Sequence, residues 1–279
     1  MVDVSDWARE RKSTGSRSGY WLHDAASRQY LLKFPKTHQS ANGSFTTGEV
    51  GAELLASRVG AFLRLPVPHV DVGALNGQVG ALVKSFLGPG QELREGIDLA
   101  RTMPRERLTL CRVLQCLGQY VDTRAARQSL VQMVCFDILV GNADRHQANW
   151  GVIVGNDRSV SIAPWYDNAA AFGSALDLRR ARQRTAAALA RFDLQFRYEI
   201  LIQDRGPKPR LQELLGKLSQ LDSDLAGFPG LMAQLTDQAI DTIVRSIADR
   251  ERIMESDRWD LAGLILRRRR DILGSRGVG

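Results

Sequence analysis

The spacing of apolar residues in this 279-residue chain changes near residue 87. Before that point, short apolar runs separated by turn residues indicate β-strands, and one longer stretch with apolar residues every three or four positions indicates a helix. The expected strands are residues 20–23, 29–34, 68–75 and 78–86, and the expected helix is residues 47–63. Asn76-Gly77 is a strong hairpin signal between the last two strands. The first part of the chain is therefore predicted to form an antiparallel sheet with one helix, with a polar loop at residues 36–44.

From Gln91 onward, the spacing is mostly that of helices. The expected helices are residues 105–121, 126–140, 177–191, 195–203, 210–221, 236–253 and 257–273. The exception is a pair of short apolar runs, residues 150–154 and 160–163, around the turn Gly155-Asn156-Asp157. These two runs predict a hairpin, and the pattern as a whole predicts an α+β protein.

The predicted hairpin is flanked by side chains suited to phosphoryl transfer. Asp144 and Asn149 precede it on a predicted loop, five positions apart, and Asp167 follows it. Because a hairpin brings its two ends together, we expect Asp167 to return to within reach of Asp144 and Asn149. Phosphoryl transfer uses one carboxylate to accept the proton of the attacking hydroxyl, and an amide oxygen and a second carboxylate to hold magnesium. The spacing therefore indicates Asp144 as the base, and Asn149 and Asp167 as metal ligands.

Two motifs around these residues resemble a known family. The segment GNADRHQANWGV, followed by APWYDNAAAFG, is similar to the carboxy-terminal kinase domain of HipA-like serine/threonine kinases, bacterial proteins that are often the toxin of a toxin–antitoxin pair. Lipid kinases related to the phosphatidylinositol kinases also carry a DRHxxN loop, but their metal motif is usually DFG. The chain has Asp167-Asn168-Ala169 there, which favours the HipA-like interpretation.

The resemblance implies a two-lobed protein-kinase-like fold that uses ATP and Mg²⁺. The small antiparallel-sheet N-lobe would span residues 1–87, and a larger all-helical C-lobe would span residues 88–279. The C-lobe would carry the catalytic loop at residues 142–151 and the metal motif at residues 165–168. By this resemblance, we expect the chain to be shorter than full-length HipA-like proteins and to lack their extra amino-terminal subdomain.

The expected N-lobe offers candidates for nucleotide binding. Lys33 lies near the end of an apolar strand, where kinases place a lysine that holds the nucleotide phosphates. Glu53 aligns best with the helix glutamate of the family and would pair with Lys33, although Glu49 lies one turn away and the sequence does not decide between them. Lys84 and Phe86 lie at the expected hinge and are predicted to contact adenine through their backbone.

The segment at residues 11–19, RKSTGSRSG, precedes the first expected strand and is rich in small residues. Such loops expose backbone N–H groups that can approach phosphates closely. The family carries a phosphate loop here that can be autophosphorylated, so Ser16 and Ser18 are candidates for nucleotide binding, and Ser13, Ser16 and Ser18 for autophosphorylation. A flexible amino-terminal arm is the alternative interpretation.

Arg145 and His146 complete the Asp-Arg-His motif. Since a kinase needs no second base, we expect His146 to brace the loop through hydrogen bonds and Arg145 to be a structural ion-pair donor. Either motif alone is compatible with an ordinary turn, a salt-bridged one at Asp-Arg-His or an Asx-turn at Tyr-Asp-Asn. Both motifs in this order and spacing favour the kinase.

The composition, 44% apolar and 25% charged residues, is that of a soluble globular protein. No apolar run approaches the roughly 20 residues that a membrane span needs, and the first residues are too polar for a signal peptide. Cys111, Cys116 and Cys135 lie in apolar helical patterns without metal-ligand spacing. We therefore expect a cytoplasmic protein with reduced cysteines in its core.

The net charge of +7 is compatible with a polyanionic partner, and equally with a modest basic excess that has no partner. The one dense basic cluster, residues 267–270, follows an apolar helical stretch. We interpret it as a solvated helix end, where cations are favourable, and not as a nucleic-acid contact. The chain shows no nucleic-acid recognition motif, so direct nucleic-acid binding is not expected.

The function predicted from the resemblance is transfer of the ATP γ-phosphoryl group to a serine or threonine hydroxyl of a protein. The family's targets include aminoacyl-tRNA synthetases, which implies a translation-related substrate, and an antitoxin is an expected partner. A lipid or small-molecule kinase would use the same residues. A pseudokinase that serves as an interaction module is a further alternative, although the complete set of Lys33, Asp144, Asn149 and Asp167 argues against it.

Overall fold

The computed structural model describes residues 1–11, 19–40, 43–101, 108–178, 189, 192–193, 195–247 and 250–275. The chain forms two compact units, each built from separate segments. Unit 1 comprises Met1–Phe86, Asp167–Leu189 and Asp237–Leu264, and unit 2 comprises Leu87–Tyr166, Ala190–Thr236 and Ile265–Gly279. The lobe boundaries expected from the sequence, residues 1–87 and 88–279, stay a prediction.

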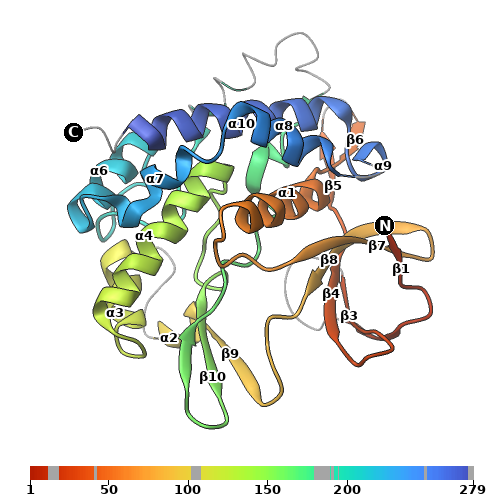
Figure 1. The fold of residues 1–279 in the computed structure, drawn as a ribbon, viewed down its shortest axis with the longest axis horizontal. Helices are drawn as coiled ribbons and strands as arrows, with labels where there is room; N and C mark the ends of the chain where they lie inside the picture. The colour runs from red at the N-terminus through yellow and green to blue at the C-terminus, as the bar shows by residue number, and fades with distance from the viewer. Residues whose placement is uncertain are drawn as a thin grey trace. The chain divides into compact units, whose positions relative to one another are not determined.

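Unit 1 is built around a six-stranded sheet with the strand order β1-β7-β8-β4-β3-β2 (Figure 1). Its strands are β1 (Val2–Asp3), β2 (Ala8–Arg11), β3 (Gly19–His23), β4 (Gln29–Lys33), β7 (Val70–Leu75) and β8 (Gln78–Lys84). Neighbouring strands are antiparallel, except that β1 pairs in parallel with β7. A buried apolar cluster that includes Leu22, Leu32 and Leu82 packs on one face. The expected antiparallel strands are thus confirmed, and β1 and β2 are additions.

The β7–β8 hairpin turns at Asn76-Gly77, as the sequence predicted. Both residues have positive φ angles, 50° and 82°, which is what a tight two-residue hairpin turn requires. The helix α1 (Glu49–Phe62) packs against β7 and β8 and is buried along most of its length. The helix expected at residues 47–63 is therefore confirmed, and it carries both glutamate candidates into unit 1.

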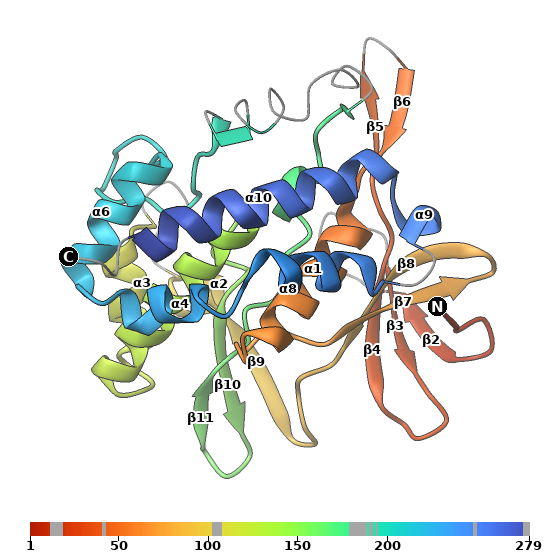
Figure 2. The same cartoon turned by 45° about the horizontal axis from the view of Figure 1, so that its top comes forward.

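A second, two-stranded sheet stands where a polar loop was expected. Strands β5 (Thr37–Ser40) and β6 (Gly43–Thr46) pair antiparallel and extend away from the six-stranded sheet (Figure 2). His38 stacks on Phe45 across the pair, with ring centroids 5.7 Å apart. The loop prediction was wrong because cross-strand pairing of this kind stabilises a polar ribbon that has no apolar alternation to reveal it.

The remaining elements of unit 1 come from the later parts of the chain. They are η2 (Ala171–Gly173), α8 (Asp237–Arg245), α9 (Arg250–Ile253) and the first part of α10 (Ser256–Gly274). The elements η2, α8 and α9 all contact α1. The single helix expected at residues 236–253 is divided into α8 and α9, and the one expected at 257–273 is confirmed as α10. The helix expected at residues 177–191 lies largely outside the described residues.

Unit 2 is organised around α4 (Thr123–Val140), which contacts its neighbours α3, α6 and η4. Its other helices are α2 (Gly96–Leu99), α3 (Leu110–Leu117), α6 (Leu211–Leu221), η4 (Leu225–Gly227), α7 (Phe228–Met232) and the last part of α10. Asp122 caps the start of α4 by accepting the N–H groups of Arg124 and Ala125. From Met133 to Val140 every residue of α4 is buried, so this helix forms the core of the unit.

A three-stranded sheet in unit 2 shows that the expectation of an all-helical C-lobe was wrong. Strand β9 (Gln91–Glu95) pairs antiparallel with β10 (Gly151–Gly155), which pairs with β11 (Val160–Ile162). The β10–β11 hairpin was predicted and is confirmed. The β9 sequence, QELRE, has no apolar period, so its strand conformation depends on pairing with β10 and not on local preference.

Residues 195–203, also expected to be helical, are largely extended or bent. Phe196, Tyr198 and Ile200 are all buried, a spacing of two that is typical of extended chain. Several backbone hydrogen bonds of this segment go to distant residues, with Leu201 bonded to Leu108 and Leu110. The helical interpretation was therefore wrong.

Two expectations about single side chains are also corrected. Arg269 in the basic run is fully buried and not solvated: its guanidinium lies over the rings of Phe192 and Phe196 and 2.8 Å from an Asp193 carboxylate oxygen. Cys111 is exposed and not in the core, because it falls on the polar side of the amphipathic helix α3.

Among the described residues, no helix combines the length and the apolar character needed to cross a membrane.

Candidate active site

One cation and two carboxylates meet at the end of strand β4 in unit 1. The Lys33 ammonium lies 2.8 Å from Glu53 Oε1 and 3.1 Å from Asp167 Oδ1. Glu53 lies on α1 and is 4% exposed, and its Oε2 accepts the backbone N–H of Asn168 at 3.1 Å. Charge-assisted bonds of this kind are the strong ones in a buried setting. The structure therefore brings together three of the predicted site residues.

The structure also distinguishes the two glutamates of α1. Glu49 Oε2 accepts the backbone N–H of Lys36 at 2.9 Å and so closes the base of the β5–β6 ribbon. Glu53, one turn further along, is the residue that reaches Lys33. The ambiguity left by the sequence is thus resolved in favour of Glu53.

Asp167 has a strained backbone. Its φ angle is 59°, in the left-handed region that non-glycine residues seldom adopt, although aspartate tolerates it better than most. Such conformations persist only where the surroundings enforce them, and they concentrate at functional sites. Here the Lys33 ion pair fixes the Asp167 side chain, while Glu53 fixes the next backbone N–H, that of Asn168.

The serine-containing loop falls at the edge of the described residues. Ser13, Ser16 and Ser18 lie outside them, so their assignments stay predictions. The flanking strands β2 and β3 pair, and Gly19, the first residue of β3, lies directly opposite Lys33 on β4. A Cβ atom at Gly19 would lie 2.6 Å from the Leu32 carbonyl oxygen, so only glycine fits this position. Strand β3, which begins at Gly19, thus pairs directly with the strand that carries Lys33.

The two hinge candidates lie where β8 ends. The backbone N–H of Lys84 donates to the His69 carbonyl at 3.0 Å. The side chain of Lys84 is exposed and that of Phe86 is half-buried. Their roles stay predictions.

The loop with Asp144 and Asn149 begins at the end of α4 in unit 2. Gly141 ends the helix with φ 70°, and the Asn142 N–H donates to the Asp137 carbonyl at 2.8 Å. A left-handed glycine followed by such a bond is a common helix stop. A Cβ atom at Gly141 would lie 2.5 Å from the Phe192 ring, so the close packing also requires glycine.

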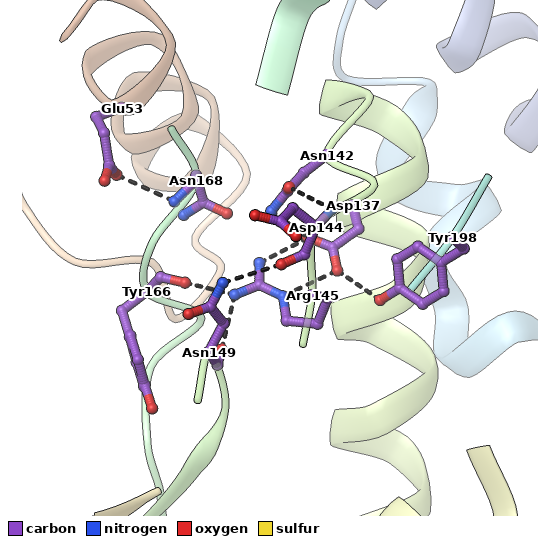
Figure 3. Close-up of polar contacts among 9 residues, drawn as sticks. All are labelled: Glu53, Asp137, Asn142, Asp144, Arg145, Asn149, Tyr166, Asn168 and Tyr198. Carbon is purple, nitrogen blue, oxygen red and sulfur yellow. Dashed lines mark hydrogen bonds and ion pairs between the residues drawn. The ribbon is translucent and has the colours of Figure 1, made fainter. Parts of the chain in front are cut away.

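Arg145 is the centre of this loop (Figure 3). Its side chain is fully buried and forms two bonds with the buried Asp137 carboxylate, at 2.6 and 3.0 Å. Its Nη1 atom donates to the Asn149 carbonyl at 2.8 Å and to the Tyr166 carbonyl. One side chain therefore joins α4, the end of the loop and the residue immediately before Asp167 in the chain, which fits the expected bracing role.

Further donors surround the Asp137 carboxylate. The Tyr198 hydroxyl donates to its Oδ2 at 2.6 Å, and the Asn142 side-chain nitrogen donates to its Oδ1 at 3.3 Å. Burial and the neighbouring Asp137 charge raise the pKa of the Tyr198 hydroxyl well above its ordinary value. Tyr198 therefore stays a neutral donor at physiological pH.

Asp144 and Asn149 face each other across the loop. The Asn149 side-chain nitrogen donates to the backbone carbonyl of Asp144 at 2.9 Å, which leaves the amide oxygen of Asn149 as the group for a metal. Within the described part of the chain, the Asp144 carboxylate forms no hydrogen bond or ion pair, so it can accept a proton. His146 shapes the loop instead: its Nδ1 accepts the Ala148 N–H, and its backbone N–H donates to the Asp144 carbonyl.

The donors present suit magnesium held partly by a nucleotide. In the described ranges, no group of three or more His, Cys, Asp or Glu side chains could hold a metal ion. Magnesium is usually bound by one or two protein oxygens together with substrate phosphates. Asn149 and Asp167 offer such oxygens, one from each unit, and that they come together stays a prediction.

Sequence reasoning missed the support around Arg145. Asp137 could have been found, because it is a charged residue within the otherwise apolar run Phe136–Val140. Such a residue needs a buried partner. Tyr198 gave no local signal, since it is one aromatic residue in a segment that was assigned as a helix.

The chain is similar to known proteins over most of its length. The family profile of the HipA-like C-terminal domain matches residues 7–225. The serine/threonine-protein kinase CtkA of Helicobacter pylori is 28% identical over 149 residues, which are 50% of this chain and 45% of that protein. The match thus spans about half the length of the curated relative.

Solved structures share the fold. The crystal structure of the proinflammatory kinase CtkA of Helicobacter pylori has a TM-score of 0.82 at 18% identity, covering 99% of this chain and 97% of that one. HipA of Shewanella oneidensis, in complex with HipB and its operator DNA, has a TM-score of 0.56 at 15% identity, covering 95% and 64%. A Golgi casein kinase has a TM-score of 0.53 at 12% identity, covering 99% and 72%. The predicted α+β, kinase-like fold is therefore confirmed.

Proposed function

This chain belongs to the HipA-like C-terminal domain family, and we propose that it is an ATP-dependent serine/threonine protein kinase. The observation that carries the proposal is the Lys33–Glu53–Asp167 cluster, in which a strand lysine pairs with a helix glutamate and with the metal-motif aspartate. Kinases use this lysine–glutamate pair to hold nucleotide phosphates. The kinase names of the sequence relative and of two structural neighbours support the same activity.

Each site residue has a task in this proposal. Lys33 binds the ATP phosphates and is held in place by Glu53. Asp144 accepts the proton of the attacking hydroxyl, and its carboxylate has no competing bond among the described residues. Asn149 and Asp167 would hold Mg²⁺, which when bound neutralises charge on the phosphate oxygens. Arg145 keeps the backbone of Asn149 and of Tyr166 in place.

The proposed acceptor is a serine or threonine hydroxyl of a protein. The γ-phosphorus–oxygen bond to ADP breaks as the bond to that hydroxyl forms, and the hydroxyl proton passes to Asp144. The segment with Ser13, Ser16 and Ser18 is one proposed acceptor in the same chain, and Ser16 and Ser18 are also proposed phosphate contacts. Lys84 and Phe86 are proposed to contact adenine through their backbone.

Partners are proposed from the family and from the structural neighbours. The Shewanella oneidensis HipA structure contains HipB and operator DNA, which supports an antitoxin-like partner for this chain. A translation-related protein, such as an aminoacyl-tRNA synthetase, is the proposed substrate. Co-purification from the native host, followed by identification of the phosphorylated proteins, tests both.

The experiment for the activity itself is transfer of labelled γ-phosphate from ATP and magnesium to proteins, lipids and small hydroxyl compounds. We expect label in phosphoserine or phosphothreonine for the wild type, and its loss in Lys33→Met. Lys217→Met is the matched control, because the Lys217 ammonium donates to Gln220 on its own helix α6, and this variant should leave transfer unchanged. Label only in lipid or small molecules would indicate a different kinase class, and ATP binding without any transfer would indicate a pseudokinase.

A further inference from the structure

A buried arginine near the start of α10 holds the segment that follows the metal motif. Arg258 is 4% exposed although its guanidinium is charged. Its Nη1 atom donates to the Ser174 carbonyl at 3.0 Å, and its Nη2 atom donates to the Leu176 carbonyl at 2.9 Å. A guanidinium is a rigid planar fork, so it can span two carbonyls that a single ammonium would serve less well.

The Ser174 carbonyl is shared with the start of α1. The backbone N–H of Gly48, the residue before α1, donates to it at 2.9 Å. A Cβ atom at Gly48 would lie 3.0 Å from Arg258 Cδ and 3.3 Å from Met254 Sδ, so the absence of a side chain permits this close approach. One carbonyl oxygen thus joins α10, the start of α1 and the segment after Asp167.

Hydrogen bonds within residues 168–174 connect Ser174 to the metal motif. The Ser174 hydroxyl donates to the Ala169 carbonyl at 2.6 Å, and the Ala171 N–H donates to the Asn168 carbonyl at 3.1 Å. The Asn168 N–H is itself bonded to Glu53 on α1. The segment is therefore closed on α1 at both ends, at Gly48 and at Glu53, and Arg258 secures the end that lies farther from Asp167.

The guanidinium charge of Arg258 is kept in a buried place, which is unfavourable unless its hydrogen bonds compensate. Burial lowers the pKa of its guanidinium, and the carboxylates of Glu255, 3.8 Å from Nε, and Asp177 oppose that shift. A buried charge is tolerated where its donor groups form hydrogen bonds. Arg245 on α8, by contrast, is exposed.

We propose that Arg258 is a positioning residue for the metal-binding motif. By holding the carbonyls of Ser174 and Leu176, it maintains residues 167–176 in the turn conformation that places Asp167, with its positive φ, beside Lys33. The inference rests on the proposed kinase function for its effect on catalysis, but the anchoring itself is independent of that function. Residues that orient metal ligands from behind typically change metal affinity or activity ~10–100-fold when removed.

The test compares Arg258→Met and Arg258→Lys with the wild type in the full chain. Without nucleotide or metal, hydrogen exchange of the amides in residues 167–176 should speed up ~10-fold or more in Arg258→Met, since local opening becomes easier. In the transfer assay, the Mg²⁺ concentration for half-maximal activity should rise ~10–100-fold in the same variant. Arg258→Lys keeps the positive charge but not the planar guanidinium. Its exchange rate and its Mg²⁺ concentration for half-maximal activity should therefore lie between those of the wild type and of Arg258→Met. If Arg258→Met fails to fold, Arg258→Lys alone carries the test.

Two controls separate positioning from general stability. Arg245→Met removes an exposed arginine of the same unit and should match the wild type in both measurements. Leu214→Ala opens a cavity in unit 2, since Leu214 is fully buried, and should lower the melting temperature without changing the Mg²⁺ dependence. Wild-type exchange and Mg²⁺ dependence in the Arg258 variants, or a change in melting temperature alone, would overturn the inference. If the wild type transfers no phosphate, the proposed function fails, and the exchange rates alone then decide whether Arg258 anchors the segment.

Discussion

At the scale of single residues, the Asp137–Arg145 pair holds the loop that carries Asp144 and Asn149. Both side chains are fully buried, and Arg145 also binds two backbone carbonyls. Forming such a pair adds little net stability, because both charges lose their hydration. Removing one partner is costly, because it leaves the other charge buried and alone.

We therefore expect Arg145→Met to lower the free energy of unfolding by about 3–5 kcal/mol, measured by denaturant titration. Replacing Asp137 by Asn in the same protein should restore part of this loss, because no uncompensated carboxylate then remains. A loss in Arg145→Met below about 1 kcal/mol, the range of exposed ion pairs, would show that the pair is not buried as described.

The Tyr198 hydroxyl makes the stability of the folded protein depend on pH in the alkaline range. Its pKa in the folded protein lies above the ordinary value of 10.0, because of burial and the adjacent Asp137. The neutral hydroxyl is thus favoured by folding, and its contribution to stability is fully present below about pH 10 and is lost as the pH rises toward the folded-state pKa.

The stability of the wild type, measured by denaturant titration between pH 8 and 11, should therefore fall more steeply above about pH 10 than that of Tyr198→Phe. At pH 7 the variant should be less stable by about 1–3 kcal/mol, since Asp137 loses a buried donor. Parallel pH profiles for the two proteins would be incompatible with this account.

The residue scale also shows what sequence could and could not provide. Asp144, Asn149 and Asp167 were predicted as site residues because their chemistry and order match a reaction, and Lys33 was predicted because of its position on an apolar strand. Asp137, Tyr198 and Arg258 support these residues from positions distant in the sequence. Their partners are backbone carbonyls or buried side chains, which leave no motif.

At the scale of elements, the spacing of apolar residues predicted the strands and helices that bury one regular face, such as α6 and the β7–β8 hairpin. It failed for β9 and for β5–β6, whose strands are polar and depend on their pairing partners. It also failed for the segment with Phe196 and Tyr198, where an alternating pattern was taken for a helical one.

The end of helix α4 depends on a glycine at position 141. Gly141 has φ 70°, and the Phe192 ring occupies the space where a Cβ atom would be. A left-handed conformation costs a non-glycine residue roughly 1–2 kcal/mol, and the clash adds to it.

Gly141→Ala should thus destabilise the protein by at least about 1 kcal/mol in thermal or chemical unfolding. Gly216→Ala, in the exposed middle of α6 where a Cβ atom meets nothing within 4 Å, is the matched control. It should be stabilising by about 0.5–1 kcal/mol, because alanine is the better helix former. An equal response of the two variants would refute the role of Gly141.

At the scale of the whole molecule, the chain has a kinase-like α+β fold and divides into two units made of interleaved segments. The candidate residues are distributed between them, with Lys33, Glu53 and Asp167 in unit 1 and Asp144 and Asn149 in unit 2. The chain passes from unit 2 to unit 1 between Tyr166 and Asp167, and Arg145 donates to the Tyr166 carbonyl. The central proposal is that the chain transfers the γ-phosphoryl group of ATP to a protein hydroxyl, with Asp144 as the base.

That claim is tested most directly by measuring ATP binding and phosphate transfer in the same preparation of Asp144→Asn. We predict that the variant binds ATP and magnesium about as tightly as the wild type, by calorimetry, but transfers no labelled γ-phosphate to protein. Binding should persist because Asp144 acts on the hydroxyl and not on the nucleotide, and transfer should stop because asparagine cannot accept the proton. Transfer at the wild-type rate by Asp144→Asn would contradict the account.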